Sequence, residues 1–118
     1  MSNQTWAGIR AEFTLPSLAQ VSSRLSELME DPEPVMQQLV RVIDDGTFCP
    51  GFQFLPGGQL RPQVVELFRR AMELDIPHNY FTVWMVTTSR DLDGSRPVDH
   101  LKGNPAPLLR ALESYRWR

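Results

Sequence analysis

Residues 77–101 read PHNYFTVWMVTTSRDLDGSRPVDHL, and this stretch decides the fold of the second half of the chain. Its first part places Phe81, Trp84 and Met85 at the three- and four-residue steps of one helical face. The β-branched residues between them weaken a helix. The apolar spacing nevertheless predicts a helix that follows Pro77.

The rest of the stretch predicts a sharp turn followed by a short helix. Residues 89–95 are polar apart from one leucine, which is typical of a loop. Gly94 stands where the chain has to reverse, because glycine tolerates a positive φ. An Arg-Pro pair then presets one or two helical turns over residues 96–101, whose last leucine is expected to pack back onto Trp84.

Outward from this stretch, further segments carry apolar residues at helical spacing. Asp31-Pro32 and Asn104-Pro105 each combine an N-cap residue with proline at the first helical position, and Pro62 begins another such segment. The first dozen residues are predicted as a short amphipathic helix or an arm. The other predicted helices cover residues 17–29, 31–46, 62–72 and 104–115. Ile43 and Met72 are among the residues expected to face inward.

The helical period is interrupted in the middle of the chain. Phe52 and Phe54 alternate with a glutamine, and residues 56–58, Pro-Gly-Gly, supply turn chemistry. The fold predicted is therefore mostly α, a small helical domain of five to seven short helices with a minor β-hairpin or extended arm in the middle. Residues 1–46 are interpreted as a degenerate helix-turn-helix-like region and residues 47–118 as a second region packed with it as one unit.

Composition places the chain among ordinary globular proteins. Its 118 residues are 42% hydrophobic and 22% charged, and ten prolines predict short elements. The N-terminus has no positive patch followed by an apolar run, and no apolar run reaches the length of a membrane span. We therefore expect a cytoplasmic protein without a membrane partner. The single cysteine, Cys49, is expected to be a buried hydrophobic residue in a reducing compartment.

Charge is distributed unevenly and bears on nucleic-acid binding. Residues 1–59 hold three arginines against seven acids, net −4, whereas residues 60–118 hold nine basic residues against seven acids, net +2. A DNA-binding region is normally basic, because neutralising phosphates supplies most of its affinity. The alternative function is nevertheless a transcriptional repressor whose recognition helix, residues 35–44, presents glutamine and arginine to a groove. Its candidate contacts are Gln37, Gln38 and Arg41.

No catalytic or metal-binding pattern stands out in the sequence. His78 and His100 are far apart and lack a zinc-like spacing to Cys49. Residues 91–94, Asp-Leu-Asp-Gly, suggest a calcium loop, but His100 stands where a bidentate glutamate is needed. We therefore predict a protein that is not an enzyme, with no catalytic residues, metal or cofactor.

One family does share the pattern of the second half. Trp84 is followed by LDGSRPVDHL at 92–101 and LLRAL at 108–112, and CPGFQF precedes them at 49–54. This resembles the toxin-binding domain of Xre/MbcA/ParS-type antitoxins, with its tryptophan helix, Leu-Gly-Gly-x-x-Pro loop, Asp-x-Leu turn and closing helix. Asp93 departs from it, since many relatives have glycine there. The residues assigned to the scaffold of this domain are Trp84, Leu92, Gly94, Arg96, Pro97 and Leu101.

The resemblance implies a function of inhibition by occlusion. In that family the partner is typically a RES-domain toxin that acts on NAD, and the C-terminal end of the antitoxin covers the toxin's active-site entrance. Carried over to this chain, the partner-binding residues are Tyr115, Arg116, Trp117 and Arg118. Aromatic and arginine side chains suit such a contact. Self-association through the helical first half, giving a homo-oligomer, is a further expectation.

Overall fold

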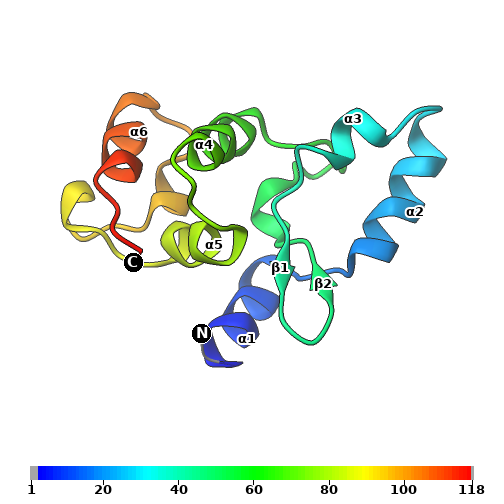
Figure 1. Cartoon of the computed structure of the whole chain (residues 1–118), viewed down its shortest axis with the longest axis horizontal. Coiled ribbons are helices and arrows are strands. Elements are labelled where there is room, and N and C mark those ends of the chain that lie inside the picture. The colour runs from blue at the N-terminus through cyan, green and yellow to red at the C-terminus, as the bar shows by residue number, and fades with distance from the viewer. Residues whose placement is uncertain (1–2, 118) are drawn as a thin grey trace. The chain divides into compact units, whose positions relative to one another are not determined.

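The computed structural model describes residues 3–117, and over this range six α-helices, three 3-10 helices and one antiparallel pair of strands form (Figure 1). The mostly helical fold with a small hairpin in its middle agrees with the sequence-based prediction. The chain divides into two compact units, Met1–Leu60 and Arg61–Arg118. None of the helices described within residues 3–117 has both the length and the apolar character needed to cross a bilayer.

Two helices open the first unit. Helix α1, Asn3–Phe13, has two buried side chains, Trp6 and Ile9, so the N-terminal segment is a packed helix. Helix α2, Leu18–Leu28, begins at a capping box in which Ser17 and Gln20 each bond the backbone of the other. Its buried stripe, Val21 and Leu25, is the one that the periodicity predicts.

The helix predicted over residues 31–46 does not form over most of that range. Helix α3 covers only Glu33–Met36, and the chain then extends into strand β1, Val42–Ile43, which pairs with strand β2, Thr47–Phe48. Gly46, the last residue of the predicted helix, lies instead in the turn between β1 and β2, with φ +125°. Ile43, expected to face inward, is 67% exposed.

Residues 47–60 pack with the first unit, although the sequence grouped them with the second half. The backbone N–H of Cys49 donates to the Pro16 carbonyl at 2.8 Å, and that of Gly51 donates to the Thr14 carbonyl at 3.0 Å. A 3-10 turn, η1, covers Gly51–Gln53. The predicted Pro-Gly-Gly turn forms next and is closed by an isolated bridge between Phe54 and Leu60.

The second unit consists of three helices with two short 3-10 turns between them. Its elements are α4 (Pro62–Glu73), α5 (His78–Val86), η2 (Arg90–Leu92), η3 (Pro97–His100) and α6 (Ala106–Glu113). Each lies where the sequence places a helix or a turn. Helix α4 buries Val64, Leu67, Phe68 and Ala71, while Met72, predicted inside, is 37% exposed at the edge of that stripe. Helix α6 packs against both α4 and η2.

Candidate binding surface at the C-terminal segment

The loop between α5 and η3 is a tight reversal built on two left-handed residues. Asp93 has φ +55° and Gly94 φ +82°, and the N–H groups of Gly94 and Ser89 donate to the carbonyls of Ser89 and Ser95. A side chain at Gly94 would meet nothing within 4 Å. Glycine is therefore favoured there by its backbone angle, as predicted. The adjacent left-handed Asp93, where relatives of the resembled family have glycine, was not anticipated.

The remaining scaffold residues lie around this loop. Leu92, Leu101 and Trp84 are buried, and η3 packs against α5. The Arg96 guanidinium binds both carboxylate oxygens of Asp99, at 2.9 and 3.1 Å. This hydrogen bonding lowers the pKa of Asp99. Pro97 is buried in the first turn of η3, and this block contacts α5 through η3 and α6 through η2.

Beyond α6 the chain turns back toward α5. The Tyr115 N–H donates to the Leu112 carbonyl at 3.1 Å, and the Tyr115 hydroxyl donates to the Tyr80 carbonyl at 3.4 Å. Its ring centroid lies 6.5 Å from that of Trp84. Burial, with Tyr80 nearby, raises the pKa of Tyr115.

Trp117 extends the same contact. Its ring lies 5.2 Å from that of Tyr80, at an interplanar angle of 44°. Tyr80 is 38% exposed, and both Tyr115 and Trp117 are half-buried. We call Tyr80, Trp84, Tyr115 and Trp117 the aromatic cluster. Tyr115 and Trp117 therefore pack on α5 and remain partly exposed. Arg118, also predicted to bind the partner, lies outside the described residues.

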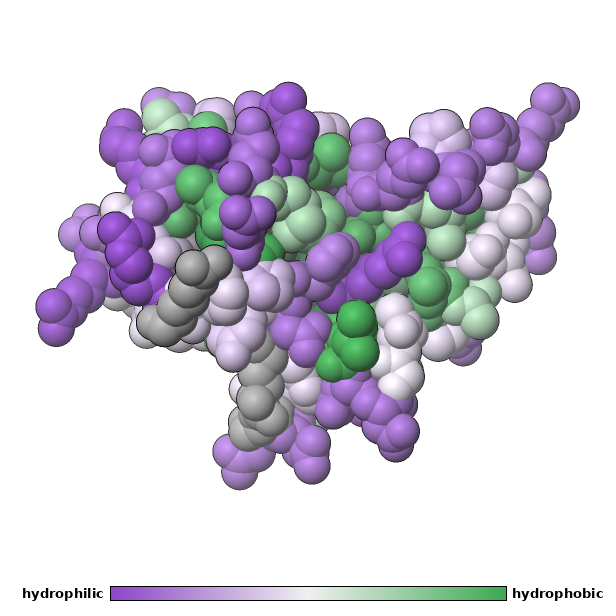
Figure 2. All heavy atoms as spheres, viewed as in Figure 1, coloured by the Kyte–Doolittle hydropathy of each residue, from purple (hydrophilic) through white to green (hydrophobic). Residues whose placement is uncertain are grey.

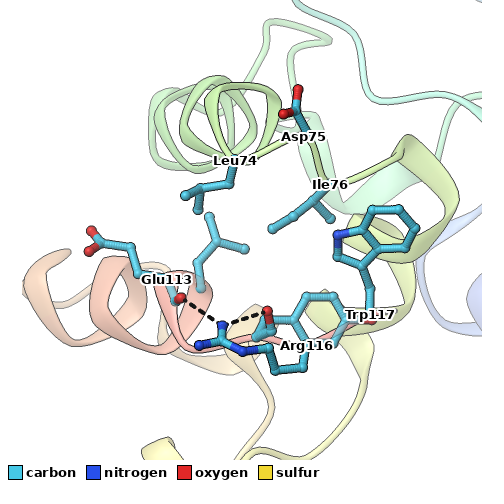
Figure 3. A pocket seen from close by; sticks show the side chains of 8 residues that line it. Leu74, Asp75, Ile76, Glu113, Arg116 and Trp117 are labelled. Carbon is cyan, nitrogen blue, oxygen red and sulfur yellow. Dashed lines mark hydrogen bonds between the residues drawn. The ribbon is translucent and has the colours of Figure 1, made fainter.

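Two hollows flank this segment. The first has a volume of about 340 Å3. Figure 3 shows Trp117 and Ile76 on one side of it, with Arg116 and Glu113 along another edge. The second, of about 250 Å3, extends from Val83 and Trp84 to the Thr-Thr-Ser run that begins the loop. Tyr115 and Arg116, two of the four predicted partner-binding residues, line both hollows and form the ridge between them.

Arg116 is the exposed residue of the ridge. One of its Nη atoms donates to the Glu113 and Tyr115 carbonyls, each at 3.4 Å, which is long for a charge-assisted bond (Figure 3). The Glu113 carboxylate points to another partner, Arg70, at 3.7 Å. The guanidinium of Arg116 is therefore weakly engaged by its own chain.

Tyr80, which contacts both Tyr115 and Trp117 of the C-terminal segment, was not predicted as a site residue. A signal for it was present, because Tyr80 and Trp84 are four residues apart on a predicted helix and must be neighbours on its surface. What the spacing does not reveal is that a segment 35 residues further along the chain covers this pair.

The three residues proposed to contact DNA do not share a recognition helix. Gln37 and Gln38 are exposed just after α3, and Arg41 lies in the extended chain beyond them. Arg41 donates from Nη2 to the Met36 carbonyl at 2.9 Å. The predicted helix over residues 35–44 is absent, so its groove-facing surface is absent as well.

Two observations concern the chemistry open to Cys49 and to the metal-binding residue types in the described part of the chain. Burial raises the pKa of the Cys49 thiol to about 11, an effect that Arg41 offsets only in part, so the reactive thiolate is disfavoured. Within residues 3–117, no three His, Cys, Asp or Glu side chains gather as a metal site. No family model matches this chain, and no curated protein or solved structure shows a significant match to it.

Proposed function

We propose that this chain is an antitoxin-like binding protein that neutralises a RES-type toxin by covering its active-site entrance with the C-terminal segment. The observation that supports this most directly is the ridge of Tyr115 and Arg116, which stands between two hollows. A ridge flanked by hollows offers a partner both a projecting side chain and recesses to fill. The motif resemblance of the second half supplies the class of partner.

The chemistry of the ridge suits tight protein binding. Tryptophan, tyrosine and arginine dominate the energetics of protein interfaces. Here the aromatic rings are held against α5 before any partner arrives, which reduces the ordering cost of association. The loosely bonded guanidinium of Arg116 is available to pair with a carboxylate of the partner.

Replacing Arg116 with alanine is expected to weaken binding to a RES-domain toxin by roughly 30-fold, about 2 kcal/mol, as for an interface hot spot. Because Arg116 is exposed, thermal unfolding of the free chain should not change. Calorimetric titration of the toxin and an assay of its NAD consumption measure the two effects.

The matched control is Arg69→Ala, since Arg69 is an exposed arginine on α4 with its side chain 74% accessible. This variant should bind and inhibit as the parent chain does. Full inhibition by Arg116→Ala, or equal losses in both variants, would show that the ridge is not the contact surface. Absence of any binding to RES-domain proteins would refute the choice of partner.

A further inference from the structure

A second concave surface lies entirely within the first unit, away from the C-terminal segment in sequence. It is a groove of about 360 Å3 between the end of α2, helix α3 and the turn before Leu60. Its lining is mostly apolar and consists of Leu25, Leu28, Met29, Val35, Gln38, Gly57, Gly58, Gln59 and Leu60. We call it the α2 groove.

The α2 groove opens onto the hydrophobic core of its unit. Leu25, on its floor, is only 3% exposed and belongs to the buried cluster that Met29, Val35 and Leu60 pack against. On its rim, Leu28 is 61% exposed, which is high for a leucine beside a core. An apolar side chain placed in the groove would therefore cover both core residues and an exposed leucine.

The edge of the groove is acidic. Four exposed carboxylates lie near the lining residues in the sequence, at the end of α2, in the link to α3 and at the start of α3. They are Glu27, Glu30, Asp31 and Glu33, and they outnumber the one exposed basic residue that lies as near to the lining residues, Arg24, which precedes Leu25. Figure 2 shows the link between these helices as a hydrophilic tip in purple. Helix α2 has no basic residue in its last turn, so the negative end of its dipole is not compensated by its own side chains. Residues 1–60 as a whole hold three arginines against seven acids, net −4.

We infer that the α2 groove binds a basic amphipathic helix of a partner protein. Apolar side chains of such a helix fill the groove, and lysines or arginines along its edges meet the carboxylates of the rim, the arrangement by which helix-binding grooves recognise their targets. The charge of the rim selects this occupant, since an acidic amphipathic segment would meet like charges. This surface is independent of the ridge at Tyr115 and Arg116.

The test uses the full chain and two designed helical peptides of equal length, one of leucine and lysine and one of leucine and glutamate. Fluorescence anisotropy should show binding of the leucine-lysine peptide and at least tenfold weaker binding of the leucine-glutamate peptide. Raising the salt concentration should weaken the former, because exposed charges are screened. Equal binding of both peptides would overturn the proposal.

A matched pair of variants locates the contact. Leu28→Gln removes an apolar side chain from the groove, while Ile43→Gln removes one of similar exposure, 67%, from the hairpin. We expect Leu28→Gln to lose about tenfold in affinity, consistent with about 1.4 kcal/mol, and Ile43→Gln to bind as the parent does. Arg116→Ala should also leave peptide binding unchanged.

Both leucine and isoleucine are exposed, so neither variant should lower the thermal unfolding temperature, which is measured alongside. Unchanged peptide binding by Leu28→Gln would refute the groove as the site. Size-exclusion chromatography tests the remaining alternative. If the chain self-associates and Leu28→Gln abolishes that self-association, the groove binds a second copy of the chain, and the proposal of a basic helix is refuted.

Discussion

An alanine in place of Gly51 is expected to destabilise the first unit by at least about 3 kcal/mol, the range of severe overpacking in a core. The added Cβ would overlap the carbonyl oxygen of Phe13 and lie 2.7 Å from the carbonyl carbon of the same residue. Backbone atoms cannot rotate away as the end of a side chain can. Relief therefore requires that α1 and η1 move apart.

That movement would break the contacts that join the two segments. The Gly51 N–H donates to the Thr14 carbonyl at 3.0 Å, and the rings of Phe13 and Phe52 pack edge to face with centroids 5.8 Å apart. Once these are lost, α1 depends on the burial of Trp6 and Ile9, because an isolated helix of its length is marginal in water. Trp6, buried in the folded unit, would then become exposed.

Urea unfolding followed by circular dichroism and tryptophan fluorescence measures both effects. Gly8→Ala is the matched control, since a Cβ at Gly8 meets nothing within 4 Å and Gly8 lies inside α1. It should raise stability by up to about 1 kcal/mol through helix propensity. An unfolding midpoint for Gly51→Ala equal to that of the parent would contradict the close packing of α1 on η1.

The elements that the sequence predicts correctly are those whose local signals agree with their packing. Helix α4 begins at a proline and buries one regular stripe, and α2 combines a capping box with a similar stripe. The turn at Gly94 needs a positive φ that glycine supplies. In each case the information lies within a dozen residues of chain.

The features that the sequence does not reveal depend on distant partners. The docking of Tyr115 and Trp117 on Tyr80 joins segments separated by about thirty-five residues, and no local pattern encodes such a contact. The candidate partner-binding residues could therefore be named from the family resemblance, but the position of Tyr115 and Arg116 between two hollows could not be predicted. The same reasoning explains why the predicted helix stops at Met36. Residues 39–43 keep an apolar spacing typical of a helix, but they lie outside any helix and end in strand β1.

At Val40, hydrogen bonds with the side chain of Gln53 replace the backbone hydrogen bonds that a helix would form. Gln53, 1% exposed, accepts from the Val40 N–H at 2.8 Å and donates to the Val40 carbonyl at 3.0 Å. It also donates to the Pro50 carbonyl at 3.0 Å. The amide thus pairs with Val40 as a neighbouring strand would. The run Val40-Arg41-Val42-Ile43, rich in β-branched residues, adapts readily to this extended form.

Gln53→Leu is therefore expected to cost about 3 kcal/mol of stability in the first unit, because each buried polar group left without a partner costs about 1–3 kcal/mol. In this variant the N–H and carbonyl of Val40 lose their hydrogen bonds to the Gln53 side-chain amide. The Pro50 carbonyl keeps only the 3.4 Å hydrogen bond from the backbone N–H of residue 53. Urea unfolding measures the loss, with Gln4→Leu as control, since Gln4 is exposed on α1. Equal midpoints for the two variants would mean that hydrophobic burial, and not the amide, keeps residues 39–43 out of a helix.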